Sequence, residues 1–428
     1  MTSKKTNEVL NMNQKESVLS EEDQKYHDSF LALIERNQIP LSRNLLILLY
    51  SLHFFTKNSN IIHQYTTKFI KLQNAIGFDE TTGKMIYDID ISDAFNVFHW
   101  IIVITFLRSF LMKYCFEPFA SRFCDIHSKK AKTRFAEQSW SFTYYTFSFI
   151  YGVHLYWHSP YFNNLDQVYI NWPNHSMFFE FKSYYLISMG FWLQQIFVLN
   201  VEKPRKDHYQ MFSHHIITCL LMVGSYYYYF YRIGHLILML MDSVDIALSG
   251  AKMLKYAGFP TACDAMFIVF LVSWIVLRHG LYNYIYVHTW NNATTLMASG
   301  RCVEGYTQKR CWTPALIDYF MGLLGGLQII TCIWMYLILK VAYKVITGKG
   351  AEDVRSDEDD TDIESVNEAE EADCEDEEEV QKNVVDEDDE DDEIEEEELF
   401  DEEKIIDDRD SLSSSSETTL DEKKERKA

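Results

Sequence analysis

This chain of 428 residues lacks the sequence features of a metal site, of a cleavable signal peptide and of a transporter built from repeats. The 8 cysteines are scattered, and none forms a C-x-x-C pair or has the spacing of a zinc site, so the sequence predicts no metal centre. The first 30 residues hold no continuous apolar run, so we expect no cleavable signal peptide. No internal repeat with paired, Gly- or Pro-broken helices is visible, which disfavours an ion-coupled transporter.

Positive charge is scarce in one part of the chain only. The formal net charge is −24, but residues 351–428 hold 39 acidic against 8 basic residues, a net of −31, and the other residues carry a net of +7. A polyanionic segment repels phosphate, so no nucleic-acid partner is expected. The tail is of low complexity and predicted to be disordered. It is either a solvated solubility segment or a regulatory one, because an acidic residue stands three positions after Ser356, Thr361, Ser365, Ser414 and Thr418, the pattern that acidophilic kinases phosphorylate.

Long apolar runs fill most of the remaining chain. A helix needs about 20 mostly apolar residues to cross the hydrocarbon layer of a bilayer. Seven stretches qualify, at residues 95–112, 138–157, 178–201, 212–231, 233–251, 265–288 and 315–343. An eighth, Leu41–Phe55, is shorter and carries Arg43 near its start. We therefore expect an all-α polytopic membrane protein with seven or eight transmembrane helices.

Basic residues gather in alternate loops, which predicts the orientation. They lie in 113–134, 203–206, 252–255 and 340–349, whereas the loop 158–177 holds no Lys or Arg. The basic loops and the acidic tail are expected in the cytosol with either count of spans. The opposite side would hold two glycosylation sequons, at Asn174 and Asn292, and one loop that contains both Cys302 and Cys311, a candidate disulfide.

The span at 233–251 carries two aspartates, Asp242 and Asp245, near its middle. Each charged Asp costs about 2.5–3.5 kcal/mol there, while the aliphatic residues of the span together return roughly 2.4–4.8 kcal/mol. The helix therefore cannot face lipid with both charged. The aspartates are three residues apart and share a face that Ser249 and Lys252 continue, so this face is predicted to line a cavity.

The preceding span opens with His214 and His215, whose side chains diverge by about 100° on a helix. A short turn at 231–232 would place this span against the aspartates as an antiparallel hairpin, and a carboxylate beside an imidazole orients it as a general base or nucleophile. Arg278 and His279 interrupt the seventh span and could supply positive charge.

Plainer interpretations remain open for each of these groups. The His pair could be polar residues at the membrane interface, and the aspartates an ion or proton relay. Arg278 could be a structural counter-ion of Asp245, and the run Tyr226–Tyr229 an aromatic belt.

Taken together, these segments resemble a known family. KPRKDHYQMFSHHIIT (203–218) followed by MDSVDIALSGAKMLKY (241–256) is similar to the Lag-type motif of ceramide synthases, in which a His pair opens one span and Met-Asp-x-x-Asp lies in the next. RFAEQSW (134–140) resembles the start of the TLC domain, and segments 267–279 and 325–340 resemble fungal members. The similarity covers roughly residues 90–345, and plain TLC proteins generally lack this combination.

The resemblance implies an N-acyltransferase of the endoplasmic reticulum that joins a fatty acyl-CoA to the amine of a sphingoid base. The essential residues of the family fall on His214, His215, Asp242 and Asp245, and Arg278, His279, Ser249, Lys252 and Lys206 are expected around the substrates. The implied regions are a polar arm (1–40), membrane spans and loops (41–133), a TLC catalytic domain enclosing an acyl-chain tunnel (134–347) and the tail (348–428).

The resemblance implies no cofactor, with acyl-CoA as a co-substrate, and membrane lipids as neighbours. Fungal enzymes of this class tend to use very long acyl chains, with a small single-span accessory subunit, and related synthases can pair as homo- or hetero-dimers. One His would deprotonate the amine or carry the acyl group covalently, with an Asp orienting it. The alternative is a non-catalytic TLC-domain protein that senses or transports lipid, which would tolerate loss of His214.

Overall fold

A computed structural model describes residues 30–57, 60–202, 208–303 and 310–346. The chain divides into two compact units, Met1–Glu364 and Ser365–Ala428, and every described residue belongs to the first. The acidic tail, its five candidate phosphorylation sites and Lys206 therefore lie outside the described residues.

Every apolar run that the sequence predicts to be a span is helical over most of its length. The helices are α3 (Phe30–Arg36), α4 (Gln38–Phe55), α5 (Ile61–Ile70), α6 (Asp93–Leu111), α7 (Glu117–Phe123), α8 (Lys129–Trp157), α9 (Phe179–Val201), α10 (His208–Tyr227), α11 (Tyr231–Tyr256), α12 (Pro260–Ser273), α13 (Tyr282–Leu296) and α14 (Pro314–Ile346). The hairpin turn before α11 lies at Tyr228–Phe230 rather than at 231–232, and Tyr229 adopts a positive φ of 60° there.

Two long helices change their winding without ending. The π-helical segment η1 (Met112–Phe116) joins α6 to α7, and η3 (Trp274–Leu281) joins α12 to α13. Segments of π-helix are rare and often occur at functional sites. The η3 segment contains Arg278 and His279, the two residues that interrupt the apolar run of the seventh predicted span.

Three short strands depart from the predicted all-α fold. They are β1 (Ala75–Phe78), β2 (Met85–Tyr87) and β3 (Met177–Phe178), antiparallel in the order β1-β2-β3, with Tyr87 opposite Met177. The prediction was wrong here because strands of two to four residues are too short to show an alternating apolar pattern. We call the end of the bundle that carries this sheet the sheet end, and the other the α7 end.

Four helical stretches of the described residues are long and apolar enough to cross a membrane. They are Asp93–Phe123, Tyr231–Tyr256, Pro260–Leu296 and Pro314–Lys344. The chain is therefore a multi-pass membrane protein. Helices α4, α8, α9 and α10 coincide with the other predicted spans, but they do not meet the same threshold of length and hydropathy.

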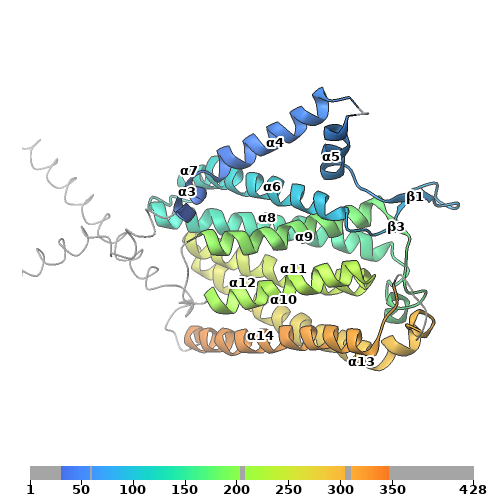
Figure 1. Cartoon of the computed structure of the whole chain (residues 1–428). Coiled ribbons are helices and arrows are strands. Elements are labelled where there is room, and N and C mark those ends of the chain that lie inside the picture. Colours follow the sequence, from blue (N-terminus) through green and yellow to red (C-terminus); the bar gives the residue numbers. More distant parts are fainter. Residues whose placement is uncertain (1–29, 58–59, 203–207, 304–309, 347–428) are drawn as a thin grey trace, which may run out of the picture. The chain divides into compact units, whose positions relative to one another are not determined.

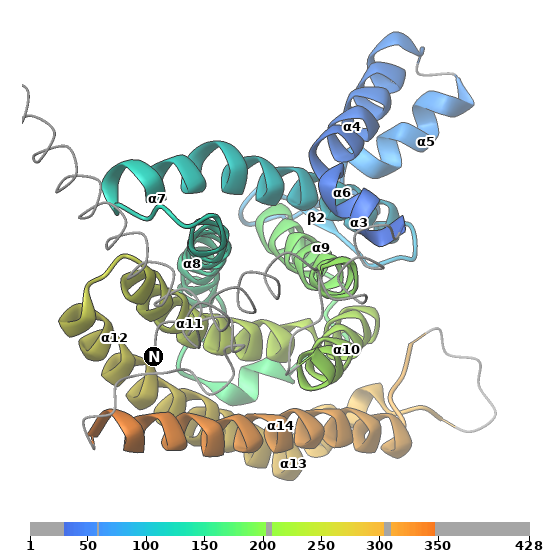
Figure 2. The same ribbon diagram turned by 90° about the vertical axis from the view of Figure 1, so that its left-hand side faces the viewer.

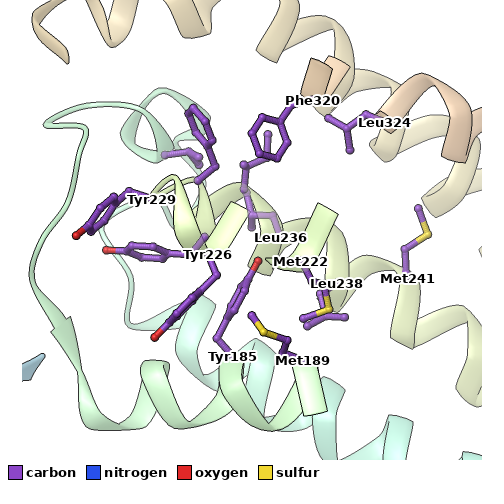
Figure 3. Close-up of a cluster of buried hydrophobic side chains, with 14 of the residues drawn as sticks. Tyr185, Met189, Met222, Tyr226, Tyr229, Leu236, Leu238, Met241, Phe320 and Leu324 are labelled. Carbon is purple, nitrogen blue, oxygen red and sulfur yellow. The ribbon is translucent and has the colours of Figure 1, made fainter. Parts of the chain in front are cut away.

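Helices α8, α9, α10 and α11 run between the two ends, and α14 packs against α10 and lies oblique to α8 and α9 (Figure 1 and Figure 2). Seen from the α7 end, α11 lies between α8, α10 and α12, while α4 and α5 project beside α6 (Figure 2). Tyr185 and Met189 of α9 meet residues of α10, α11 and α14 in the core shown in Figure 3. Within a bilayer such contacts hold helices by close packing. A Cβ at Gly190 would lie 2.8 Å from that of Trp100, so glycine allows α9 to approach α6 this closely.

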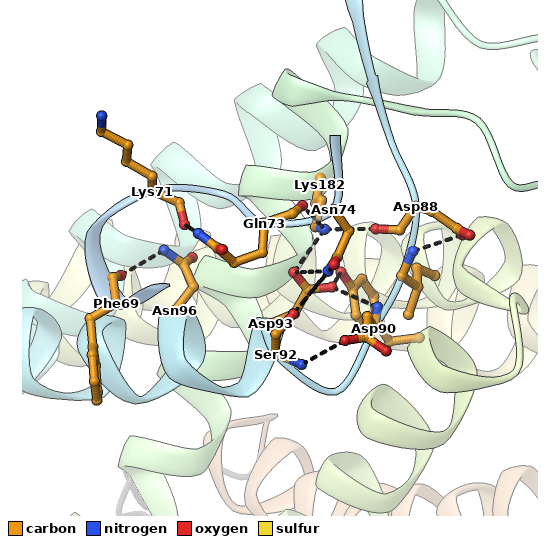
Figure 4. A network of polar contacts seen from close by, with 12 residues as sticks. Phe69, Lys71, Gln73, Asn74, Asp88, Asp90, Ser92, Asp93, Asn96 and Lys182 are labelled. Atoms are coloured by element: carbon orange, nitrogen blue, oxygen red, sulfur yellow. Dashed lines mark hydrogen bonds and ion pairs between the residues drawn. The ribbon is translucent and has the colours of Figure 1, made fainter. Parts of the chain in front are cut away.

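A buried ionic network fastens the sheet end to the bundle (Figure 4). Lys182 of α9 pairs with Asp93 at 2.7 Å and donates to the carbonyl oxygens of Gln73 and Asp88, and its side chain is fully buried. Tyr226 donates to Asp93, and Tyr229 to Asp88. These two tyrosines are therefore buried hydrogen-bond donors, and predicting that the run 226–229 forms an interfacial aromatic belt was wrong for them.

Candidate active site

Two cavities of different character meet inside the bundle. The apolar cavity, of about 90 Å³, extends from α10 and α11 toward the sheet end, where Tyr169, Met297 and Ile317 line it. The second cavity, of about 160 Å³, has a larger polar share in its still mostly apolar lining, and we call it the polar cavity; it extends toward the α7 end, where Gln138, Ser141 and Ser249 line it. Four residues line both cavities and form the junction: Trp192, His214, Asp245 and Arg278.

His214 and His215 differ in their surroundings although they are adjacent on α10. His214 lines both cavities, whereas His215 lines only the polar one. Trp192 and Trp334 flank His214, with ring centroids 5.7 and 5.0 Å from it. The Nδ1 atoms of both histidines are buried without a hydrogen-bond partner among the described residues. The divergence expected for adjacent helical side chains thus places one imidazole at the junction.

The aspartates of α11 also separate. Asp242 is fully buried and accepts a hydrogen bond of 2.6 Å from Ser148 of α8, and its other oxygen, Oδ1, has no partner in the described part of the chain. Asp245 lies at the junction and pairs with Arg278 at 2.8 Å. The hydrogen bond of Asp242 that the structure shows goes to α8, and the expectation that Asp242 or Asp245 orients a histidine stays a prediction.

Arg278 is held from three directions in η3. Its Nη2 donates to Asp245 and to the carbonyl oxygen of Met241, at 2.8 and 3.1 Å, and its guanidinium stacks 4.2 Å from the ring centroid of Trp274. Only 4% of the residue is exposed. The ionic pair with Asp245 agrees with the counter-ion interpretation, and the position at the junction also leaves Arg278 able to meet a substrate.

The other predicted shell residues lie in different places. Ser249 lines the polar cavity, whereas Lys252 lines neither cavity of the junction. His279 faces away, since its Nε2 accepts from Trp274 at 3.2 Å and its Nδ1 lies 2.8 Å from the Gln328 amide. The structure therefore does not place His279 in the site.

Residues that the sequence interpretation missed complete the walls. Thr218 lies one turn beyond His214, lines the apolar cavity and has a buried hydroxyl with no partner among the residues described. Two hydroxyl pairs, Tyr185 with Ser225 and Tyr169 with Thr289, each at 2.6 Å, satisfy one another in the apolar wall. No motif or periodicity marks any of these residues, because each contact joins separate helices.

The remaining candidates lie near the sheet end. Cys302 and Cys311 form a disulfide, with their Cα atoms 4.8 Å apart. The Asn174 Nδ2, the atom that glycosylation would modify, is buried, and Asn292 is partly buried within α13. Among the residues described, no three His, Cys, Asp or Glu side chains come together to hold a metal ion.

Comparison with known proteins places this arrangement in a family. The TLC domain (TRAM, LAG1 and CLN8 type) matches residues 134–340. The chain is 40% identical over 275 residues to the sphingosine N-acyltransferase lag1 of Schizosaccharomyces pombe, covering 64% of this chain and 69% of that protein. It is 32% identical over 339 residues to the ceramide synthase LAG1 of Saccharomyces cerevisiae, covering 77% and 78%. It is 34% identical over 226 residues to human ceramide synthase 5, covering 53% and 54%. The chain belongs to the ceramide synthase family of TLC-domain proteins.

Proposed function

We propose that this protein transfers a fatty acyl group from acyl-CoA to the amine of a sphingoid base, which yields a ceramide and free CoA. The names of its relatives support N-acylation of a sphingoid base. The observation that carries the assignment of the site is the junction, where an apolar and a polar cavity meet at His214, Asp245 and Arg278. An acyl thioester has the same division, with an apolar chain on one side of its carbonyl and a polar carrier on the other.

The acyl chain would enter the apolar cavity with its carbonyl at the junction. The CoA portion would approach from the polar cavity, on the side that the basic loops predict to be cytosolic. The apolar cavity is narrow, so a long chain must displace side chains such as Met241 or Leu238 along it. Methionine and leucine rotamers adapt to such a change more readily than aromatic ones.

His214 is the group we propose to act on the reacting atoms, because of the two histidines only it lines both cavities. A sphingoid amine is mostly protonated at neutral pH and must lose a proton before it attacks. A neutral imidazole can accept that proton, or it can attack the thioester first and carry the acyl group until the amine arrives. In either order a C–N bond forms, the C–S bond breaks and the sulfur leaves as the thiol of CoA.

Arg278 would stabilise the negative charge that develops on the carbonyl oxygen. Its guanidinium is fixed by Asp245, Met241 and Trp274, so little reorganisation is needed when the charge appears. Asp242 would act at a distance from the reaction, since its bond to Ser148 fixes α11 against α8. His215 would line the route by which the carrier enters.

The cellular setting belongs to the same proposal. Eight spans in the endoplasmic reticulum membrane, with the tail in the cytosol, fit the distribution of basic loops. A preference for very long acyl chains, an accessory single-span subunit and pairing with a related synthase follow from the resemblance to fungal members. Each is open to direct measurement on the purified protein.

A microsomal assay with acyl-CoA and sphinganine tests the catalytic assignment. We expect His214→Ala to abolish N-acylation and His215→Ala to reduce it less, with expression matched to the wild type. Intact-mass analysis with acyl-CoA and no amine separates the two routes, because an added acyl mass that His214→Ala removes indicates a covalent acyl-imidazole. Equal turnover in wild type and His214→Ala would contradict the assignment and favour a lipid-sensing or lipid-transport protein.

A further inference from the structure

A third cavity lies at the α7 end, apart from the junction. It has a volume of about 620 Å³ and is formed by residues of α3, α4, α6, η1, α7 and α8 together with Glu202 after α9. Helix α8 separates it from the polar cavity, since Glu137 lines the one and Gln138 the other. Figure 2 shows the helices that surround it from the α7 end. We call it the basic cavity.

Charged side chains dominate the wall of the basic cavity. Among the residues of the wall that the structure describes, six are cationic and four are carboxylates, a formal excess of two positive charges: Arg36, Arg108, Lys113, Lys129, Lys130 and Arg134 against Glu35, Glu117, Glu137 and Glu202. Two of the carboxylates pair with cations of the same wall, Glu137 with Arg134 at 3.3 Å and Glu202 with Arg108 at 2.6 Å. The excess of positive charge favours an anion in the cavity.

Arg108 is the buried member of this wall. It is 6% exposed, although it is a charged residue near the end of an apolar helix. Its Nη2 donates to Glu202, and its Nε and Nη1 groups have no acceptor within the described ranges. A buried guanidinium with donors left over suits a planar or tetrahedral oxyanion, which can accept from two nitrogens at once.

The start of α8 adds a second source of positive potential. This helix begins with Lys129 and Lys130, has no acidic residue in its first turn, and receives no side-chain cap from Ser128. Cations at a helix N-terminus are disfavoured by the macrodipole, whereas an anion there is stabilised by the dipole and by the lysines together. An anion in the basic cavity would therefore interact favourably with both the N-terminus of α8 and its two lysines.

We propose that the basic cavity binds the phosphate of an anionic phospholipid headgroup. The cavity lies where apolar helices give way to charged residues, which is the level of lipid headgroups, and basic pockets between transmembrane helices bind such groups. Apolar side chains for the acyl chains are exposed beside it, including Leu41 and Leu45 of α4, Phe110 of α6 and Tyr114 of η1. The proposal does not rest on the acyltransferase activity. The nucleotide end of CoA carries the same phosphate chemistry, so the test separates the two sources.

The test uses the purified full-length protein in neutral detergent, with native mass spectrometry and the unfolding temperature as readouts. The probes are dioctanoyl phosphatidic acid, dioctanoyl phosphatidylcholine and free CoA. Lys113 and Lys129 are exposed, so K113Q/K129Q should fold, and the matched control K57Q/K71Q removes two exposed lysines at the sheet end. Arg108→Gln is a second variant, which removes the buried cation.

We expect phosphatidic acid to bind saturably and to raise the unfolding temperature, and phosphatidylcholine to do neither. K113Q/K129Q should weaken the binding about 30-fold, since about 1 kcal/mol per cation converts at 1.4 kcal/mol per factor of ten, and K57Q/K71Q should not change it. Equal affinity of K113Q/K129Q and wild type would overturn the proposal, as would equal binding of phosphatidylcholine. Displacement of the lipid by micromolar CoA would assign the cavity to the nucleotide and overturn the lipid assignment.

Discussion

Gly234 lies on α11 in the wall of the apolar cavity, beside the hydroxyl pair of Tyr185 and Ser225. A Cβ added there would lie 2.1 Å from the Tyr185 hydroxyl oxygen and 2.9 Å from the Ser225 Oγ, both well inside van der Waals contact. We therefore predict that Gly234→Ala destabilises the protein and narrows the cavity. Neither effect would follow from helix propensity alone, which favours alanine over glycine by about 1 kcal/mol.

The size of the effect follows from two contributions. Forcing a methyl group into a packed core costs typically about 1–3 kcal/mol. Displacing Tyr185 also breaks its hydrogen bond to Ser225, which is worth about 0.5–1.5 kcal/mol. After subtracting the gain in helix propensity, we expect a net loss of roughly 0.5–3.5 kcal/mol of stability. The narrowed cavity should also shift the N-acylation profile toward shorter acyl chains.

The measurement is the unfolding temperature in detergent, together with the acyl-chain profile in a competition of acyl-CoA donors. Gly322→Ala on α14 is the control, because no atom lies within 4 Å of the added Cβ there. Tyr185→Phe should restore part of the stability of Gly234→Ala, since the nearest remaining ring carbon is 3.2 Å away. An unfolding temperature of Gly234→Ala equal to that of Gly322→Ala would refute the reasoning.

Three further predictions concern polar contacts. Ser148→Ala should cost about 1.5–3 kcal/mol, because it leaves the buried Asp242 without its hydrogen bond, and the unfolding temperature measures this. Arg278→Lys should lower turnover by roughly 10²-fold with little change in apparent KM, because lysine keeps the charge but cannot reproduce the fixed fork of donors. Burial raises the pKa of Asp88, but hydrogen bonds from Tyr229 and the Ile89 amide outweigh this and hold the pKa below its usual value. Ionised Asp88 therefore stabilises the fold above about pH 4, and this contribution is lost as the pH falls further. In Tyr229→Phe the contribution is smaller, so the unfolding temperature should fall less at acid pH than it does in the wild type, and a pH series of unfolding temperatures measures this.

Two of these predictions have a matched control variant. Ser213→Ala removes an exposed hydroxyl that bonds only its own helix, and it should change stability by less than about 0.5 kcal/mol. Tyr227→Phe, at the end of α10 beside the hairpin turn, tests whether loss of any tyrosine hydroxyl there changes the fall in unfolding temperature at acid pH, since Tyr227 is 47% exposed. If the unfolding temperature falls with pH in the same way in wild type and in Tyr229→Phe, the hydrogen bond from Tyr229 does not lower the pKa of Asp88. A loss in Arg278→Lys that lies wholly in KM would show that Arg278 binds substrate and does not stabilise the developing charge.

Local patterns were enough to predict the helices of the apolar runs, whereas the short helices α5 and α7 were not predicted. Each apolar run is long, and a backbone in an apolar environment must form its hydrogen bonds within its own segment. A single segment can do this only as a helix. The interruption at Arg278 and His279 coincides with the π-helical η3, although the sequence alone did not predict a change of winding. The three strands escaped prediction because pairing of β2 with β1 and with β3, almost a hundred residues later, creates them.

The site divides in the same way. Intramembrane His and Asp residues marked α10 and α11, because placing such groups in lipid is costly and requires a protein-lined cavity. The pairing of Asp245 with Arg278 was among the interpretations of the sequence, but the other partners were not predictable: Asp242 bonds Ser148 of α8, and the junction combines residues of four separate elements.

The sequence by itself determined the membrane-spanning character, the charged tail and the candidates for the reactive side chains, since hydropathy and charge are properties of single segments. Only the tertiary structure decided which histidine reaches both cavities and where a third, basic cavity opens. A 100° step along one helix turns adjacent side chains toward different neighbours, and the neighbours come from elements distant in the chain.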